Sequence, residues 1–300
     1  MSSSSSGRLR TSVTVSDGTS IAVREFGGPT GTRNSPDRKP RLAGEGDARL
    51  TEEGDRTILL LHGLMGRAST WWTPSRWLAD HGRVVGVDAR GHGDSPATGP
   101  WRTERFVADL VEVIEKLDLG RCVVIGHSMG GLHGWELAAA RPDLVEALVV
   151  EDMAPDHTGR TADSWTSWFA AMPRAFPSVA AVRAAFGYPR PSWGDYLAEC
   201  VREASDGYRL LTDPFQAGDI ASEWGEVSFW DGVRGVRCPT LLLQAEDTPI
   251  AGEQMAEMAR VIPGARHVLV PGTGHLLHDD APERYRELVE EWLASLPGRG

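Results

Sequence analysis

The stretch VVIGHSMGG, residues 123–131, decides the fold because a run of apolar residues leads directly into a serine set among glycines. An alanine-rich segment with helical character, LHGWELAAARP (132–142), follows it. A Gly-x-Ser-x-Gly pattern between a buried strand and a helix is typical of a nucleophile elbow, a strained turn that holds a serine hydroxyl above the edge of a sheet. An ordinary turn is the alternative, but the strand and helix on either side favour Ser128 as a nucleophile.

Five further apolar runs resemble the one before Ser128, and such runs are typical of strands buried on both faces of a parallel sheet. The six are TILLLHG (57–63), RVVGVD (83–88), CVVIGHS (122–128), EALVVED (146–152), TLLLQAED (240–247) and RHVLVPG (266–272). Amphipathic segments such as 102–120 and 281–296 lie between or after them. The alternation predicts right-handed βαβ units and a doubly wound, mostly parallel sheet of the α/β class. Residues 11–26 add an N-terminal antiparallel hairpin around Asp17-Gly18.

The alternation breaks between residues 154 and 237, which are too many for one crossover. This segment carries five of the chain's 11 tryptophans, namely Trp165, Trp168, Trp193, Trp224 and Trp230. We predict a helical lid, inserted after the sixth strand, over a pocket at the carboxyl ends of the strands, where open α/β sheets bind ligands. Trp165 and Trp168 are its candidate substrate contacts. The alternative is an excursion whose tryptophans only fill its own small core.

The remaining boundaries follow from composition. Residues 11–153 and 238–300 are predicted to form the core domain. Residues 1–10 are expected to be a flexible polar start without the apolar region of a secretory signal. The segment 27–56, rich in Gly, Pro and charge, is expected to be a surface loop insertion, disordered rather than partner-binding.

Charge and cysteine content narrow the function. The formal net charge is −11 and no basic cluster stands out, which argues against nucleic acid or anionic membranes as partners. No apolar run approaches the length of a membrane span. Cys122, Cys200 and Cys238 are scattered, which favours buried thiols over a disulfide or zinc site. We expect a cytoplasmic monomer or dimer that acts on a small molecule and needs no cofactor or metal.

Four ordered motifs make the chain similar to the α/β-hydrolases over about residues 11–296. They are LLLHGLMG (59–66), DARGHGDS (88–95), GHSMGG (126–131) and GTGHLLHDDAP (272–282). The resemblance implies that His275, after the last strand, is the general base for Ser128. It also implies that His62, His92 and His278 are structural, and that the backbone N–H of Leu64 is an oxyanion donor. The backbone N–H of Met129 is the second donor, since it lies at a helix N-terminus.

The acid that orients His275 has two candidates. Most members of the family carry it after the strand PTLLLQ, but there Thr248 occupies the expected position and Asp247 is one residue out of register. Some members carry it after the preceding strand, where EALVVED ends in Asp152. We favour Asp152, although it could instead cap the loop into the lid.

A serine nucleophile disfavours the dehalogenases and epoxide hydrolases of this family, which use an aspartate. We therefore predict a carboxylic ester hydrolase for an apolar or aromatic small molecule, acting through an acyl-enzyme on Ser128. The alternatives are a carbon–carbon bond hydrolase, a thioesterase, a lyase or a cofactor-free peroxidase-type enzyme on the same triad. A non-catalytic receptor for a small ligand is a further alternative, since a fold does not specify a function.

Overall fold

The computed structural model describes residues 10–28, 56–159, 167–248 and 252–297. The predicted flexible start lies outside this range except for Arg10. The predicted loop insertion 27–56 also lies outside it, apart from its ends: Gly27 closes one strand and Arg56 opens the next.

An eight-stranded sheet forms the centre of the molecule, in the order β1-β2-β4-β3-β5-β6-β9-β10. Neighbours from β4 to β10 are parallel, and β1–β2 and β2–β4 are antiparallel. The predicted mostly parallel sheet with an N-terminal hairpin is therefore confirmed. Its strands are Arg10–Thr14 (β1), Ser20–Gly27 (β2), Arg56–Leu61 (β3), Gly82–Val87 (β4), Cys122–His127 (β5), Val145–Glu151 (β6), Thr240–Asp247 (β9) and Arg266–Gly274 (β10).

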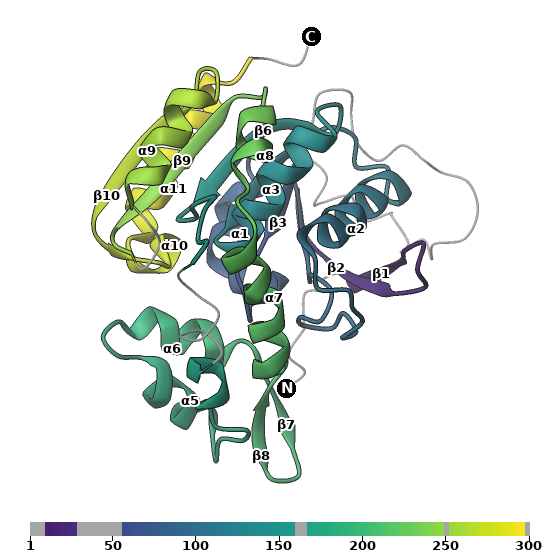
Figure 1. Ribbon diagram of the computed structural model, residues 1–300, viewed down its shortest axis with the longest axis vertical. Helices are drawn as coiled ribbons and strands as arrows, with labels where there is room; N and C mark the ends of the chain where they lie inside the picture. The colour runs from purple at the N-terminus through teal and green to yellow at the C-terminus, as the bar shows by residue number, and fades with distance from the viewer. Residues whose placement is uncertain (1–9, 29–55, 160–166, 249–251, 298–300) are drawn as a thin grey trace, which may run out of the picture.

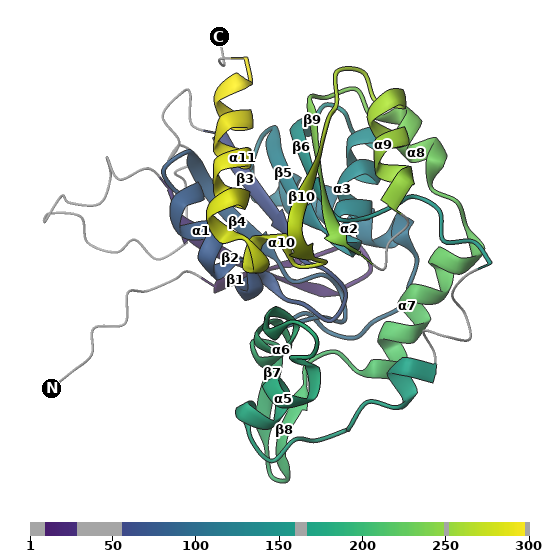
Figure 2. The ribbon, with the colours of Figure 1, turned by 90° about the vertical axis from the view of Figure 1, so that its left-hand side faces the viewer.

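Helices cover both faces of the sheet, as the buried apolar runs require. Helices α1 and α11 lie on one face, and α2, α3, α8 and α9 on the other (Figures 1 and 2). Each face has its own apolar core, because alternate side chains of one strand point to opposite faces. The helices outside the insertion are Trp72–Leu78 (α1, preceded by the 3₁₀ turn η2, Ala68–Trp71), Thr103–Lys116 (α2), Met129–Ala140 (α3), Trp230–Gly235 (α8), Gly252–Val261 (α9), Leu277–Asp280 (α10) and Pro282–Ser295 (α11).

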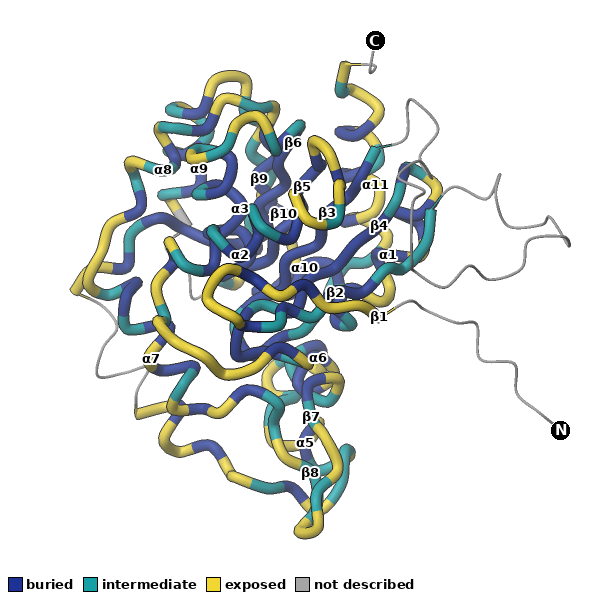
Figure 3. Tube along the Cα trace, turned by 90° about the vertical axis from the view of Figure 1, so that its right-hand side faces the viewer, coloured by how far each residue is buried: buried dark blue, intermediate teal, exposed yellow. Residues whose placement is uncertain are grey.

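The chain between β6 and β9 leaves the sheet and gathers beyond the carboxyl ends of its strands (Figures 1 and 2). We call residues 154–237 the insertion; α8 at its end packs back against α3. Its other elements are Val179–Phe186 (α5), Pro191–Ala198 (α6), Val201–Ala204 (β7), Gly207–Leu210 (β8) and Pro214–Glu226 (α7). Figure 3 shows that parts of the β7–β8 hairpin are exposed (yellow), whereas the central strands of the sheet are buried (dark blue).

The hairpin is a difference from the expected all-helical insertion. β7 and β8 pair antiparallel from Val201–Leu210 to Ala204–Gly207. The two strands are joined by the two-residue turn Ser205-Asp206, and Gly207, which follows it and pairs with Ala204, has a φ of 122° that other residues rarely adopt.

The sequence predicts buried free thiols and no membrane-spanning segment, and the described residues bear on both predictions. Cys122 and Cys200 are buried and Cys238 is partly buried, and all three are free thiols. Burial raises the pKa of the Cys200 thiol, so it is not an activated nucleophile. Among the described residues, none of the helices combines the length and the apolar character needed to cross a bilayer.

Candidate active site

Ser128 lies at the sharp turn between β5 and α3. Its backbone has φ 51° and ψ −120°, a left-handed conformation that is costly for a residue with a side chain. The neighbouring glycines make the turn possible: a Cβ at Gly126 would overlap the carbonyl of Gly130, and one at Gly130 would overlap that of Leu61. The small residues therefore let α3 pack directly against the ends of β5 and β3, as the elbow pattern requires.

Backbone strain is concentrated around this turn. Four non-glycine residues in the described part of the chain have positive φ: Met65, Asp118, Ser128 and Asp152. Of these, Met65 follows Leu64 in the loop after β3, and Asp152 follows β6, so three of the four belong to segments that meet at the elbow. Strained residues persist where the surrounding structure holds them, and they cluster at functional sites.

Asp152 and His275 form a buried pair. His275 Nδ1 lies 2.7 Å from Asp152 Oδ2, and 7% of the histidine side chain and none of the aspartate side chain is exposed. The Asp152 carboxylate accepts two more hydrogen bonds, from Ala245 N at 2.9 Å and from Thr248 Oγ1 at 2.6 Å. Thr248, which occupies the family's usual acid position, therefore donates a hydrogen bond to the carboxylate that replaces that acid.

Asp247 lies elsewhere. Its side chain is 74% exposed, and its carboxylate is 3.5 Å from the guanidinium of Arg190. Of the two candidate acids, Asp152 alone has its carboxylate in contact with His275.

The loop after β3 presents the predicted backbone donors beside the elbow. Within the described residues, the N–H groups of Leu64 and Met129 have no hydrogen-bond acceptor. Gly63 packs so tightly that a Cβ there would lie 2.6 Å from His127 Nδ1 and 3.3 Å from Ser128 Cβ. These N–H groups and Ser128 therefore belong to one compact region, and free backbone donors next to a nucleophile suit a developing oxyanion.

The histidines predicted to be structural have fixed partners. His62 Nδ1 contacts Gly63 O at 2.7 Å and its Nε2 accepts from Ala89 N at 3.0 Å. Burial lowers the pKa of His62 to about 4, so it is neutral with its proton on Nδ1. His127 Nε2 donates to His275 O at 2.8 Å. It thus ties the elbow to the loop that carries His275.

His278 forms a second buried histidine–carboxylate pair. Its Nδ1 lies 2.8 Å from Glu151 Oε1, and its ring stacks on Trp71 at a centroid distance of 4.5 Å. Burial favours the neutral imidazole, but the negative charge of Glu151 outweighs it and raises the pKa of His278 to about 9. The raised pKa favours a protonated His278 opposite the Glu151 carboxylate.

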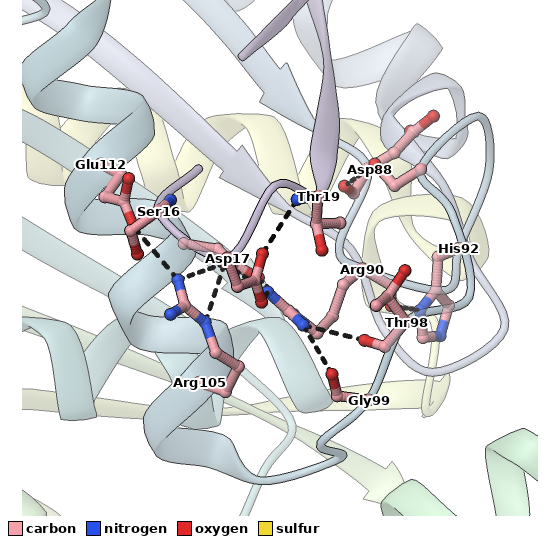
Figure 4. Close-up of polar contacts among 12 residues, drawn as sticks. Ser16, Asp17, Thr19, Asp88, Arg90, His92, Thr98, Gly99, Arg105 and Glu112 are labelled. Atoms are coloured by element: carbon pink, nitrogen blue, oxygen red, sulfur yellow. Dashed lines mark hydrogen bonds and ion pairs between the residues drawn. The ribbon is translucent and has the colours of Figure 1, made fainter. Parts of the chain in front are cut away.

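The motif DARGHGDS forms the loop that supports His62. The Arg90 guanidinium is buried and binds Asp109 at 2.6 and 2.7 Å, Asp17 at 2.9 Å and the carbonyl of Thr98 at 2.8 Å. Figure 4 shows Arg90 between the hairpin turn at Asp17 and the loop at Thr98 and Gly99. These contacts join β1–β2, the loop and α2, so Arg90 holds these elements together.

The insertion contacts the site through α6. The Trp193 ring stacks on His275 at 5.6 Å and 18° between planes. Arg190 precedes α6, donates to Gly272 O at 2.9 Å and lies 3.6 Å from Asp280. Tyr196 donates to Gly63 O at 3.2 Å. Trp193 and Tyr196 are three residues apart on α6 and therefore lie on one face of the helix, and Arg190 is its N-cap residue.

The tryptophans chosen from the sequence differ from those that touch the site. Trp165 lies outside the described residues. Trp168 is 48% exposed and its ring contacts Phe169 at 4.9 Å, so its role in substrate binding stays a prediction. Sequence reasoning missed Trp193, Tyr196 and Arg190; the Pro191 that opens α6 and their three-residue spacing were the available signals. Among the described residues, no cluster of His, Cys, Asp or Glu is arranged to hold a metal ion.

Comparisons with known proteins identify the family and the fold. A model of the alpha/beta hydrolase family matches residues 58–288. The chain is 32% identical over 259 residues to sn-1-specific diacylglycerol lipase ABHD11 of Mus musculus, covering 81% of this chain and 83% of that protein. It is 24% identical over 265 residues to (E)-2-((N-methylformamido)methylene)succinate hydrolase of Acinetobacter baylyi, covering 86% and 98%.

A solved structure gives the same fold. The crystal structure of E-2-(acetamidomethylene)succinate hydrolase superposes with a TM-score of 0.78 at 20% identity, covering 96% of this chain and 100% of that chain. At this identity the likeness concerns the fold alone.

Proposed function

Because the chain belongs to the alpha/beta hydrolase family, we propose that it is a serine hydrolase that cleaves a carboxylic ester of an apolar or aromatic small molecule. The observation that carries the proposal is the contact of 2.7 Å between His275 and Asp152 beside the strained turn at Ser128. A nucleophile, a base and a carboxylate that orients the base are the elements of acyl transfer.

In the proposed reaction, Ser128 Oγ attacks the ester carbonyl while His275 Nε2 accepts its proton. The Asp152 carboxylate accepts a hydrogen bond from the Nδ1–H group of His275, which fixes the tautomer and stabilises the imidazolium that forms. The N–H groups of Leu64 and Met129 donate to the oxyanion of the tetrahedral intermediate. The C–O bond then breaks, and His275 returns the proton to the departing alcohol.

Water completes the cycle by the same steps. His275 takes a proton from water as its oxygen attacks the acyl carbon, and a second tetrahedral intermediate forms. Its collapse releases the carboxylic acid, and His275 returns the proton to Ser128. No redox partner or metal enters these steps.

The preference for an apolar ester rests on the insertion and on the relatives. The stacked Trp193 lines the face of His275 with an aromatic surface. The 32% identical relative from Mus musculus is named a diacylglycerol lipase, an enzyme whose substrate is an ester with apolar acyl chains. The buried thiols suit the cytoplasm, which we propose as its location.

The test is fluorophosphonate labelling read by intact mass, together with hydrolysis of a short p-nitrophenyl ester. Wild type should gain one label rapidly and hydrolyse the ester, and Ser128→Ala should do neither. Ser75→Ala, which removes an equally buried hydroxyl on α1, should behave as wild type. Labelling and turnover retained by Ser128→Ala would overturn the proposal, and adding thioesters and vinylogous diketones to the substrate panel tests the preference for esters.

A further inference from the structure

The carbonyl oxygen of Gly63 is held by three donors, two from its own loop and one from the insertion. Gly66 N–H donates from within the loop at 3.0 Å. His62 Nδ1 contacts it at 2.7 Å, and the hydroxyl of Tyr196 at 3.2 Å. The Tyr196 contact differs from the other two because it comes from the insertion, 133 residues further along the chain.

This carbonyl belongs to the same peptide unit as the N–H of Leu64. The peptide bond is planar and trans, so its C=O and N–H point in opposite directions. Donors that fix the direction of Gly63 O therefore fix the direction of the Leu64 N–H as well. A rotation of this peptide unit would turn the Leu64 donor away from the oxyanion.

The loop leaves room for the Tyr196 hydroxyl. A Cβ at Gly66 would overlap that hydroxyl, so only glycine permits the contact. The Tyr196 ring is 3% exposed and packs edge-on against His127, with centroids 6.0 Å apart. Burial raises the pKa of Tyr196 well above its usual 10, so the hydroxyl keeps its proton and is a donor at neutral pH.

We propose that Tyr196 is a positioning residue for the oxyanion hole: through Gly63 O it orients the Leu64 N–H that stabilises the tetrahedral intermediate. The inference rests on the proposed function and extends it to the insertion. Helix α6 then serves both halves of the machinery, because Trp193 packs on His275 one turn before Tyr196 reaches the oxyanion loop.

The experiment compares an ester with its thionoester, in which sulfur replaces the carbonyl oxygen. Sulfur is larger and a weaker hydrogen-bond acceptor, so an intact oxyanion hole favours the oxygen substrate. The ratio of the two kcat/KM values is measured on one sample, so it does not depend on the folded fraction. Tyr196→Phe removes the hydroxyl and keeps the ring. Tyr208→Phe, a tyrosine of the β8 strand, is the matched control.

We expect Tyr196→Phe to lower the ester-to-thionoester ratio by about 3- to 10-fold, the range for one lost hydrogen bond. The loss should fall on kcat for the ester, with KM changed less than about 2-fold, and Tyr208→Phe should match wild type. An unchanged ratio in Tyr196→Phe would overturn the inference and leave the proposed function intact. No ester hydrolysis by wild type would remove the proposed function, and this inference with it.

Discussion

Glu151 and Asp152 are adjacent residues at the end of β6, and their carboxylates contact two histidines that follow β10. The surroundings of these two histidines differ. Asp152 contacts His275 and Glu151 contacts His278, at 2.7 and 2.8 Å between the nearest atoms. The distances are nearly equal and all four side chains are buried. Bond length therefore does not separate the pair that we propose to react from the structural one.

The surroundings of the two rings differ. His278 is enclosed by aromatic rings, with Trp71 at 4.5 Å and Tyr285 at 5.9 Å, and 1% of its side chain is exposed. His275 lies beside the elbow and keeps 7% of its side chain exposed. We infer that access of the ring to the nucleophile and to solvent, rather than the carboxylate partner, distinguishes the pair that we propose to react from the pair that only holds the chain together.

The largest expected effect follows from neutralising Asp152, the acid of the pair Asp152–His275, which we call the accessible pair. Asp152→Asn keeps the shape but removes the negative charge that fixes the tautomer of His275 and stabilises its imidazolium. We expect kcat for a p-nitrophenyl ester to fall by about 10³- to 10⁴-fold, as for triad acids in general. Steady-state kinetics measure it, and circular dichroism checks that the variant is folded.

Asp247→Asn is the matched control for that loss. Its exposed carboxylate lies 3.5 Å from the Arg190 guanidinium, and an ion pair exposed to solvent contributes little to stability. We therefore expect kcat to stay within about 2-fold of wild type. The opposite ranking of the two variants would assign the acid to Asp247 and remove the contrast between the two pairs.

For the pair Glu151–His278, which we call the enclosed pair, substitution should lower the stability of the protein rather than its activity. Glu151→Gln removes the charge that balances the His278 imidazolium, and breaking a buried ion pair by removing one partner typically costs about 3–5 kcal/mol. We expect urea unfolding to show a loss of about 3 kcal/mol. Ester hydrolysis at low temperature should stay within about 10-fold of wild type, since the Asp152–His275 contact is untouched. A loss of kcat as large as that of Asp152→Asn would mean that both pairs take part in the chemistry.

The pH dependence of stability separates the pairs further. Glu151, Asp279 and Asp280 surround His278 with negative charge, and the pKa of His278 is raised to about 9 from its usual 6.5. A group whose pKa is higher in the folded state stabilises the protein below the unfolded pKa and ceases to do so as pH rises through the folded value. We expect the free energy of unfolding to fall by on the order of 3 kcal/mol between pH 6.5 and 9.5 because of this group.

His278→Gln provides the reference for that titration. It has no imidazole, so its stability should change less than that of wild type over the same pH range, and the difference between the two curves isolates His278. Parallel curves would show that His278 is neutral in the folded protein, and the ion pair would then be an ordinary hydrogen bond.

How far the sequence predicted these pairs depends on where their members lie. The sheet, the elbow and the loop of His275 follow from apolar runs and spaced motifs, and the structure has them at the predicted residues. Asp152 was preferred because Thr248 occupies the usual acid position, and the structure adds a reason: Thr248 donates to Asp152. Local patterns are informative here because strands of a parallel sheet end at the same edge.

The contacts from the insertion were not predicted, for a physical reason. Tyr196 and Trp193 reach the site only through the path of a chain segment that carries no motif. The pairing of Glu151 with His278 likewise joins residues 127 positions apart. Periodicity shows which residues are buried, but not which distant partner they meet, so these positioning contacts needed the structure.

The smallest expected effect concerns the hydrogen bond from Thr248 that helps to orient the Asp152 carboxylate. Thr248→Val keeps the shape of the side chain but removes the hydroxyl that donates to Asp152 Oδ2, the same oxygen that contacts His275 Nδ1. Asp152 keeps the bond from Ala245 N, so its orientation survives in part. The loss of one hydrogen bond to a charged group should lower kcat by about 5- to 10-fold and leave KM unchanged. Kinetics on the p-nitrophenyl ester measure it, with Thr240→Val, at a buried threonine that opens β9, as the control for lost hydroxyl packing. If Thr248→Val and Thr240→Val lowered kcat equally, the hydroxyl would serve only the fold, and the Asp152 carboxylate would be oriented by the backbone alone.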